Sequence, residues 1–135
     1  MEAPHQDLFA QLESWAARQK GIFGILLVGS QASGTARPDS DVDLVIIAEN
    51  CEAYLSKLEW AAEFGDVSRT QTEDWGKVTS VRVWYQGGLE LEFGFADKSW
   101  VATPRDAGTQ DVLAGGYRIL FERDDLLTKA ITNRP

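Results

Sequence analysis

Cysteine is almost absent from this sequence, which contains only Cys51 among its 135 residues. A single cysteine cannot form an internal disulfide bond, which fits a reducing compartment, so we expect a cytoplasmic protein. The first residues, MEAPHQDLFA, lack the basic stretch followed by an apolar stretch that marks a signal peptide. No apolar run approaches the length of a membrane span, so we expect no membrane association.

Basic residues are few relative to acidic ones, with 13 Lys and Arg against 21 Asp and Glu and a net charge of −8. An acidic chain repels the phosphate backbone, which disfavours a long nucleic acid as partner. The same charge would attract a small cationic molecule. Its other explanation is that the acidity simply keeps the protein soluble.

The length fits a single domain covering residues 1–135. A domain of this size buries about two-thirds of the surface of its unfolded chain, which is enough for a hydrophobic core. Hydrophobic residues make up 44% and charged residues 25%, as is ordinary for a soluble globular protein.

Helical and strand-like spacings of apolar residues are interleaved along the chain. Two alternating stretches, 78–85 and 89–95, are joined by Gln86-Gly87-Gly88 and predict a β-hairpin. We predict helices over residues 7–20, 51–64, 107–114 and 124–131, the last capped by Asp124, strands over 22–28, 41–48, 67–72, 78–85, 89–95 and 117–121, and a turn over 73–76. This order predicts an α/β (α+β) fold, in which helices flank a mixed β-sheet.

The chain is organised around the stretch GSQASGTARPDSDVDL, residues 29–44. Asp41 and Asp43 stand at the start of a predicted strand, and side chains two residues apart on a strand point to the same face. At ~5 Å and an effective dielectric of about 20, two such carboxylates repel each other by roughly 3 kcal/mol. A divalent cation removes that penalty, and Mg²⁺ prefers carboxylate oxygen.

The same stretch begins with a turn, because Gly29 and Ser30 directly follow the apolar run 22–28. Glycine lets the backbone approach a ligand closely, and a helix start after the turn would offer free N–H groups to a phosphate. A phosphate-binding turn followed by a metal-binding carboxylate pair indicates nucleotide chemistry. The alternative is a tight turn between two strands with solvated aspartates.

Seven positions of this stretch resemble a known signature, and they are Gly29, Ser30, Gly34, Ser40, Asp41, Asp43 and Leu44. It is the signature of the nucleotidyltransferase superfamily typified by DNA polymerase beta. That superfamily includes kanamycin-type and lincosamide nucleotidyltransferases, poly(A) polymerases and minimal nucleotidyltransferases. The resemblance covers roughly residues 22–100 and implies a polymerase beta-like nucleotidyltransferase core. The stretch 89–104 also resembles bacterial proteins grouped near antibiotic-modifying enzymes.

The resemblance implies a third carboxylate on a later strand, and Glu92 is the best match. Many members have aspartate at this position, so the glutamate is a departure. Asp41, Asp43 and Glu92 would then be the catalytic residues and would hold two Mg²⁺ ions. Glu90 lies on the same face and is either a general base for the acceptor hydroxyl or a solvated strand residue.

A nucleoside triphosphate, with ATP as the expected donor, is the substrate that the family implies. The residues expected to bind it are Gly29, Ser30 and Ser40. Positive charge should help pyrophosphate to leave. The candidates are Arg37, Lys77 and Arg82, although loop and strand cations are usually solvated.

Two tryptophans, Trp75 and Trp100, fall in predicted loops, where each either binds a nucleobase or acceptor or covers the core. Residues 97–100 directly follow the strand of the third carboxylate, so we expect them to lie at the rim of the site.

Three functions fit the sequence. The first is a nucleotidyltransferase that modifies a hydroxyl of a small acceptor, such as an aminoglycoside-like cation. The second is a minimal nucleotidyltransferase that modifies a partner protein, as in toxin–antitoxin pairs. The third is an inactive nucleotide-binding module. About 35 residues follow Trp100, so we expect a homodimer partner or another protein to complete the acceptor pocket.

Overall fold

The computed structural model describes residues 6–29, 41–100, 113–114 and 116–132. The predictions for Ser30, Arg37 and Ser40, and for most of the helix over 107–114, fall outside these residues.

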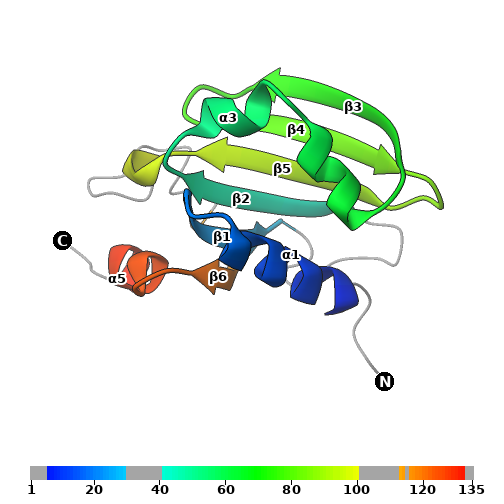
Figure 1. Cartoon of the computed structure of the whole chain (residues 1–135). Coiled ribbons are helices and arrows are strands. Elements are labelled where there is room, and N and C mark those ends of the chain that lie inside the picture. Colours follow the sequence, from blue (N-terminus) through cyan, green and yellow to red (C-terminus); the bar gives the residue numbers. More distant parts are fainter. Residues whose placement is uncertain (1–5, 30–40, 101–112, 115, 133–135) are drawn as a thin grey trace.

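A six-stranded sheet forms the centre of the molecule, with the order β3-β4-β5-β2-β1-β6 (Figure 1). Its strands are β1 (Ile22–Val28), β2 (Val42–Ala48), β3 (Val67–Asp74), β4 (Thr79–Tyr85), β5 (Glu90–Ala96) and β6 (Tyr117–Glu122). Strands β2 and β5 run parallel, and the other neighbouring pairs of the described sheet run antiparallel. The predicted mixed sheet flanked by helices is therefore confirmed.

Short helices surround the sheet. They are α1 (Gln6–Arg18), α3 (Cys51–Leu55), α5 (Leu126–Thr132) and the two 3₁₀ helices η1 (Glu59–Phe64) and η2 (Lys98–Trp100). In the described part of the chain, no helix has the length and apolar composition needed to span a membrane.

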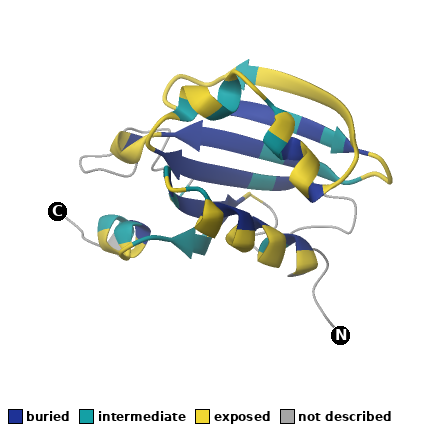
Figure 2. Ribbon diagram, viewed as in Figure 1, coloured by how far each residue is buried: buried dark blue, intermediate teal, exposed yellow. Residues whose placement is uncertain are grey.

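One face of the sheet is buried under α1, α3 and η1. Because side chains alternate along a strand, Leu91 and Phe93 of β5 point into this core. The aromatic rings meet mostly edge to face, as Trp15 of α1 does with Phe64 at 5.5 Å between centroids, and as Trp60 does with Phe93 at 4.8 Å. The central strands are accordingly the darkest blue in Figure 2.

The opposite face is covered at one end by η2 and α5. Trp100 and Leu127 are buried there with Leu26, Ile47 and Ala96 of the sheet. Since Ala96 ends β5, this second core lies toward the carboxyl end of that strand. The predicted strands 22–28 and 41–48 are buried on both faces because each separates the two cores.

The helix predicted over 51–64 is wrong as a single element, because it is interrupted between Leu55 and Glu59. The indole N–H of Trp60 donates to the Tyr54 carbonyl at 2.8 Å, which occupies an acceptor that a continuous helix would use. The 3₁₀ segment then buries Ala61 and Phe64 and ends, as predicted, at Gly65, whose φ is 149°.

The turn predicted over 73–76 begins later, because β3 continues to Asp74. The Asp74 carboxylate accepts a hydrogen bond from the Gly76 N–H at 2.8 Å, and the Trp75 N–H donates to the Val78 carbonyl at 2.8 Å. Strand β3 is an edge strand exposed along nearly its whole length, so apolar alternation could not mark its end.

The predicted cap of the last helix, Asp124, is also wrong. Asp124 and Asp125 both adopt left-handed backbone angles, with φ of 53° and 56°. The carboxylate of Glu122 instead accepts hydrogen bonds from the N–H of Thr128 at 2.9 Å and from its hydroxyl at 2.6 Å. The two-residue turn folds the start of α5 back onto the end of β6, which brings Glu122 within reach.

A side chain remote in sequence closes the end of α1. The guanidinium of Arg123 donates to the carbonyl oxygens of four residues, with N···O distances of 2.9–3.1 Å, and these are Ala16, Ala17, Gln19 and Ile22. The last carbonyls of a helix have no partner within the helix, and a cation at this end also complements the helix dipole. Arg123 thus joins α1, β1 and the end of β6.

Arg123→Met should destabilise the fold, because it removes all of the hydrogen bonds that the guanidinium donates to carbonyls of α1 and of the residues after it. We expect a loss of about 2 kcal/mol in the free energy of unfolding, on the scale of hydrogen bonds to a charged group. Urea denaturation followed by circular dichroism would measure it. Arg18→Met, at an arginine whose side chain is 60% exposed, is the control and should cost far less. Equal losses in the two variants would contradict this role of Arg123.

Candidate active site

Three neighbouring strands bring charged residues into one row across the sheet. Asp43 of β2 is paired with Glu92 of β5, and Glu92 is paired with Arg82 of β4. The next row with side chains on the same face contains Glu90, which is paired with Trp84. Because Leu91 and Phe93 point into the first core, Glu90 and Glu92 point to the opposite face. The charged rows therefore lie on the second face, away from the end covered by η2 and α5.

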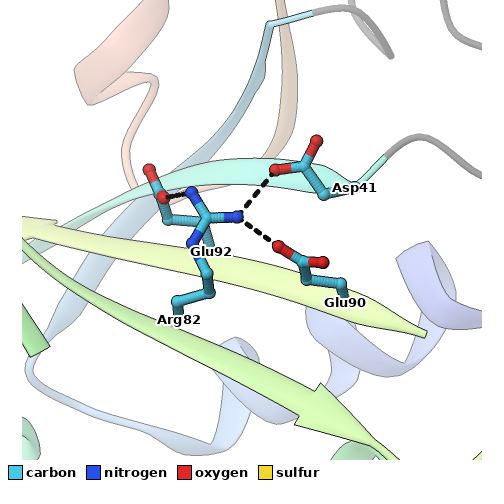
Figure 3. A network of polar contacts seen from close by, with 4 residues as sticks. All are labelled: Asp41, Arg82, Glu90 and Glu92. Atoms are coloured by element: carbon cyan, nitrogen blue, oxygen red, sulfur yellow. Dashed lines mark hydrogen bonds and ion pairs between the residues drawn. The ribbon is translucent and has the colours of Figure 1, made fainter. Parts of the chain in front are cut away.

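The guanidinium of Arg82 lies among three carboxylates, as Figure 3 shows. Its Nη1 atom is 3.1 Å from Oδ2 of Asp41 and also contacts Glu90, while Nη2 contacts Glu92. All four side chains are partly buried, with 20–33% of each exposed. Partial burial strengthens these ion pairs relative to fully solvated ones.

Asp43 has the most perturbed carboxyl group of the site. Its pKa is raised from 3.8 to about 7, first by burial, then by the negative charge of Asp41 and a hydrogen bond with it, and then by the charge of Glu92. Arg82 lowers this pKa by a smaller amount. Burial likewise raises the pKa of Glu92, although Arg82 opposes the shift. The site thus holds more negative charge than its own arginine neutralises.

Gly29 lies directly against Asp43. Its φ is 73°, and a Cβ atom added to it would stand 2.5 Å from Oδ2 of Asp43. Any side chain would therefore be strained twice, by the left-handed backbone and by the contact with the carboxylate. This agrees with our expectation that position 29 needs the conformation and the closeness that glycine allows. The turn after β1 and the carboxylate of β2 thus form one unit.

The structure brings together five of the predicted site residues, namely Gly29, Asp41, Asp43, Glu90 and Glu92. Ser30 and Ser40 belong to the segment that the structure does not describe. The sheet register also separates the two glutamates, because Glu92 is opposite Asp43 whereas Glu90 is one row away. The catalytic and metal-binding roles of these residues remain predictions.

Arg82 is the residue whose position the sequence did not indicate. It was one of three candidates for a cation that assists the departure of pyrophosphate, the alternative being a solvated side chain, and its guanidinium in fact contacts three carboxylates. The signal was present in the alternation of the two hairpin strands, since Arg82 shares a face with Glu90 and Glu92 once β4 and β5 pair. The sequence pattern did not give the register between β4 and β5, which pairs Arg82 with Glu92.

Lys77, the other candidate cation in the described residues, lies at the opposite end of the strands, as do the loop tryptophans. Lys77 and Trp75 precede Thr79, which is paired with Phe95 rather than with Glu92. Trp100 follows the carboxyl end of β5 and is buried in the second core. The expectation that residues 97–100 rim the site is therefore wrong, because the carboxylates stand at the start of β5. Trp100 covers the core, and Trp75 is 63% exposed.

The donor chemistry of the site fits a divalent cation. Carboxylate oxygens are the ligands that Mg²⁺ prefers, and burial together with the negative charges of Asp41 and Glu92 raises the pKa of Asp43, which a bound cation would oppose. In the described part of the chain, however, no three acidic, histidine or cysteine side chains are already arranged around a common point. Asp41 and Glu92 are turned toward Arg82 instead.

Asp43→Asn should stabilise the protein increasingly as pH rises. A carboxyl whose pKa is higher in the folded than in the unfolded chain binds its proton more tightly when folded, so its contribution to stability is lost as pH rises from about 4 to about 7. We expect the variant to gain roughly 1–3 kcal/mol over the wild type between pH 4 and pH 8. Urea denaturation in EDTA-containing buffers would test this.

Asp66→Asn is the matched control for that measurement, since Asp66 is an exposed acid outside the site. Its difference from the wild type gives the baseline against which the effect of Asp43→Asn is compared. A pH-independent effect of Asp43→Asn would show that the Asp43 carboxyl is not perturbed.

Comparisons with known proteins agree with this geometry. Residues 10–81, more than half of the chain, match the sequence profile of the family described as "Nucleotidyltransferase domain". No curated protein matches the sequence at a significant level. The fold is similar to that of an aminoglycoside 6-adenyltransferase from Bacillus subtilis, with 13% identity and a TM-score of 0.57, over 87% of this chain and 40% of that protein.

Two further structures are similar at lower TM-scores. Cid1 in complex with its short product ApU has 13% identity and a TM-score of 0.49, over 68% of this chain and 29% of that one. Terminal uridylyl transferase 4 from Trypanosoma brucei with bound UPU has 14% identity and a TM-score of 0.45, over 80% and 37%. This chain thus spans well under half the length of these relatives. The profile match confirms the family that the motif in residues 29–44 indicates, and this chain belongs to the nucleotidyltransferase domain family.

Proposed function

We propose that this chain is a Mg²⁺-dependent nucleotidyltransferase. It transfers a nucleoside monophosphate from a nucleoside triphosphate, with ATP as the expected donor, to a hydroxyl group of a small acceptor. The acceptor hydroxyl gives up its proton to a nearby base or to water, and a bond forms between its oxygen and the α-phosphorus. The bond from that phosphorus to the bridging oxygen breaks, and pyrophosphate leaves with its electron pair. Membership of the family supports the reaction class. The described strands form one sheet with its two cores, which supports treating the chain as one domain.

The observation that carries this proposal is the row in which Asp43 and Glu92 stand side by side on parallel strands. Asp41 lies beside Asp43 and adds a third carboxylate. Asp41, Asp43 and Glu92 would hold two Mg²⁺ ions, which would supply positive charge for the triphosphate and for the acceptor oxygen. Asp43 and Glu92 come from the start of buried strands, so the sheet holds these two side chains in fixed register.

Gly29 gives the triphosphate room to approach. The absence of a side chain lets the backbone at the end of β1 lie directly against Asp43, whose Oδ2 would stand 2.5 Å from an added Cβ. A phosphate group close to this backbone would stand next to the carboxylate row, which is what transfer to a nearby acceptor requires. Ser30 and Ser40 are proposed as further nucleotide-binding residues on the strength of the motif.

The acceptor is proposed to be a small cationic molecule with free hydroxyl groups. The net charge of −8 favours a cation, and Glu90 adds a carboxylate at the edge of the proposed metal site. The similar fold of the Bacillus subtilis aminoglycoside 6-adenyltransferase makes aminoglycosides the first acceptors to test. Labelling of a protein in place of a small molecule would favour the minimal nucleotidyltransferase alternative, and absence of any transfer would favour an inactive binding module.

Incubation of the protein with each labelled nucleoside triphosphate, Mg²⁺ and a panel of hydroxyl-bearing cations should yield a labelled acceptor. Asp41→Asn, Asp43→Asn and Glu92→Gln should each lower the rate by at least about a hundredfold, because each removes a charged ligand from the transition state. Glu90→Gln should keep more activity, because Glu90 is not opposite Asp43. Asp66→Asn is the control for loss of an acidic charge.

Normal turnover in any of the first three variants would remove that residue from the catalytic set. A larger loss in Glu90→Gln than in Glu92→Gln would reverse their assignment. Circular dichroism of each variant would separate a catalytic loss from unfolding.

Gly29→Val should weaken nucleotide binding by at least about 1 kcal/mol, on the scale of a local strain cost. The added side chain would meet Asp43 and occupy the space proposed for phosphate. Calorimetry with a non-hydrolysable ATP analogue would measure the change. Gly76→Val is the matched control, since Gly76 also has a positive φ of 90° but has open space around it and lies at the far end of the sheet. Unchanged affinity in Gly29→Val would count against a phosphate-binding turn.

A further inference from the structure

The ion pairs of Arg82 involve two of the three residues proposed to bind the metal. Nη2 contacts Glu92, and Nη1 lies 3.1 Å from Asp41. The same Nη1 atom also contacts Glu90, which is outside the proposed metal set. Arg82 has no such contact with Asp43 within the described residues. Two of the three proposed ligands are therefore in direct contact with the protein's own cation.

We propose that Arg82 is an internal counter-ion that competes with the divalent cation for Asp41 and Glu92, and that Glu90 retains Arg82 when the cation binds. The inference rests on the proposed function, because it takes Asp41, Asp43 and Glu92 as ligands of the cation. Arg82 is then a positioning residue that acts through the carboxylates it holds.

Charge balance supports competition. Four carboxylates, Asp41, Asp43, Glu90 and Glu92, face one guanidinium in this part of the site. A divalent cation bound to Asp41 and Glu92 would be repelled by a guanidinium in contact with the same two groups, since like charges a few ångströms apart interact strongly in a half-buried site. Binding of the cation therefore requires Arg82 to give up these contacts.

Geometry explains why Glu90 is the residue that retains Arg82. Glu90 and Glu92 are two residues apart on one strand and share a face, so Arg82 can release Glu92 and still reach Glu90. Nη1 contacts both Asp41 and Glu90, so it can release Asp41 and keep its contact with Glu90. Without Glu90, the guanidinium would have Asp41 and Glu92 as its remaining partners and would hold them more firmly.

Binding of Mn²⁺ to the nucleotide-free full chain tests the proposal without any activity measurement. Electron paramagnetic resonance of free Mn²⁺ gives the dissociation constant. We expect Arg82→Gln to bind Mn²⁺ about tenfold more tightly and Glu90→Gln to bind it several-fold more weakly than the wild type. Arg82→Lys keeps the charge but contacts fewer carboxylates at once, so its affinity should lie between those of the wild type and Arg82→Gln.

The double variant R82Q/E90Q separates the proposed role of Glu90 from a simple loss of negative charge. If Glu90 acts through Arg82, Glu90→Gln should have little effect in the Arg82→Gln background. Equal weakening by Glu90→Gln in both backgrounds would overturn this part of the proposal. Arg69→Gln is the charge-matched control, because Arg69 stacks on Trp84 at 4.0 Å and forms no ion pair with the site carboxylates in the described structure.

Weaker Mn²⁺ binding by Arg82→Gln and Arg82→Lys would overturn the competition and show that Arg82 supports the metal ligands. An equal gain in Arg69→Gln would also overturn it, since the effect would then be one of net charge. Binding of Mn²⁺ to Asp43→Asn tests the underlying assumption that Asp43 is a ligand of the cation. If wild-type binding of Mn²⁺ does not depend on Asp43, the proposed metal site fails as well.

Discussion

The parallel pairing of β2 with β5 is the constraint on which the site depends. These strands are far apart in sequence, and their register places Asp43 beside Glu92. A one-residue shift of β5 would bury the glutamates under α1 and η1 and expose Leu91 and Phe93, at a cost of several buried apolar side chains. The aromatic core beneath the sheet therefore fixes which acids face each other on the other side. The like charges remain clustered because another register would expose buried apolar side chains, which costs more free energy than the repulsion.

The two ends of the second face of the sheet carry different kinds of residue. At the carboxyl end of β5, Trp100 and Leu127 cover the sheet and form the second core. At the amino end, charged residues replace the apolar ones, and Arg82 offsets part of their repulsion. Desolvation and neighbouring charge then act together on Asp43, whose pKa they raise to about 7. Such perturbed groups are typical of functional sites.

Most of the fold and of the candidate site could be predicted from the sequence because the informative elements are buried. The apolar run 22–28 is a strand with the predicted ends, and the alternation of 89–95 correctly places Glu90 and Glu92 on the side away from the core. Edge strand β3 was too short in the prediction because its exposed residues carry no burial pattern. The break after Leu55 depends on a tertiary hydrogen bond from Trp60, which local propensity does not encode.

Specific side-chain contacts explain the remaining differences. Arg82 meets its carboxylates across strands, and Glu122, rather than Asp124, caps α5 because of a two-residue left-handed turn. Neither pairing has a fixed spacing in the sequence. The motif in residues 29–44, by contrast, is local, so it marked Gly29, Asp41 and Asp43 as candidate site residues before the order of the strands was known.

The hydrogen bonds that Arg123 forms with the end of α1 have a consequence for how the chain folds during synthesis. Its partners lie 101–107 residues earlier, so during synthesis these carbonyls of α1 and of the residues after it emerge from the ribosome long before their donor does. Strand β1 likewise pairs with β6, which is synthesised much later. Contacts of such high sequence separation form late and slow folding. The hydrogen bonds at the end of α1 and the pairing of β1 with β6 are therefore completed late in folding.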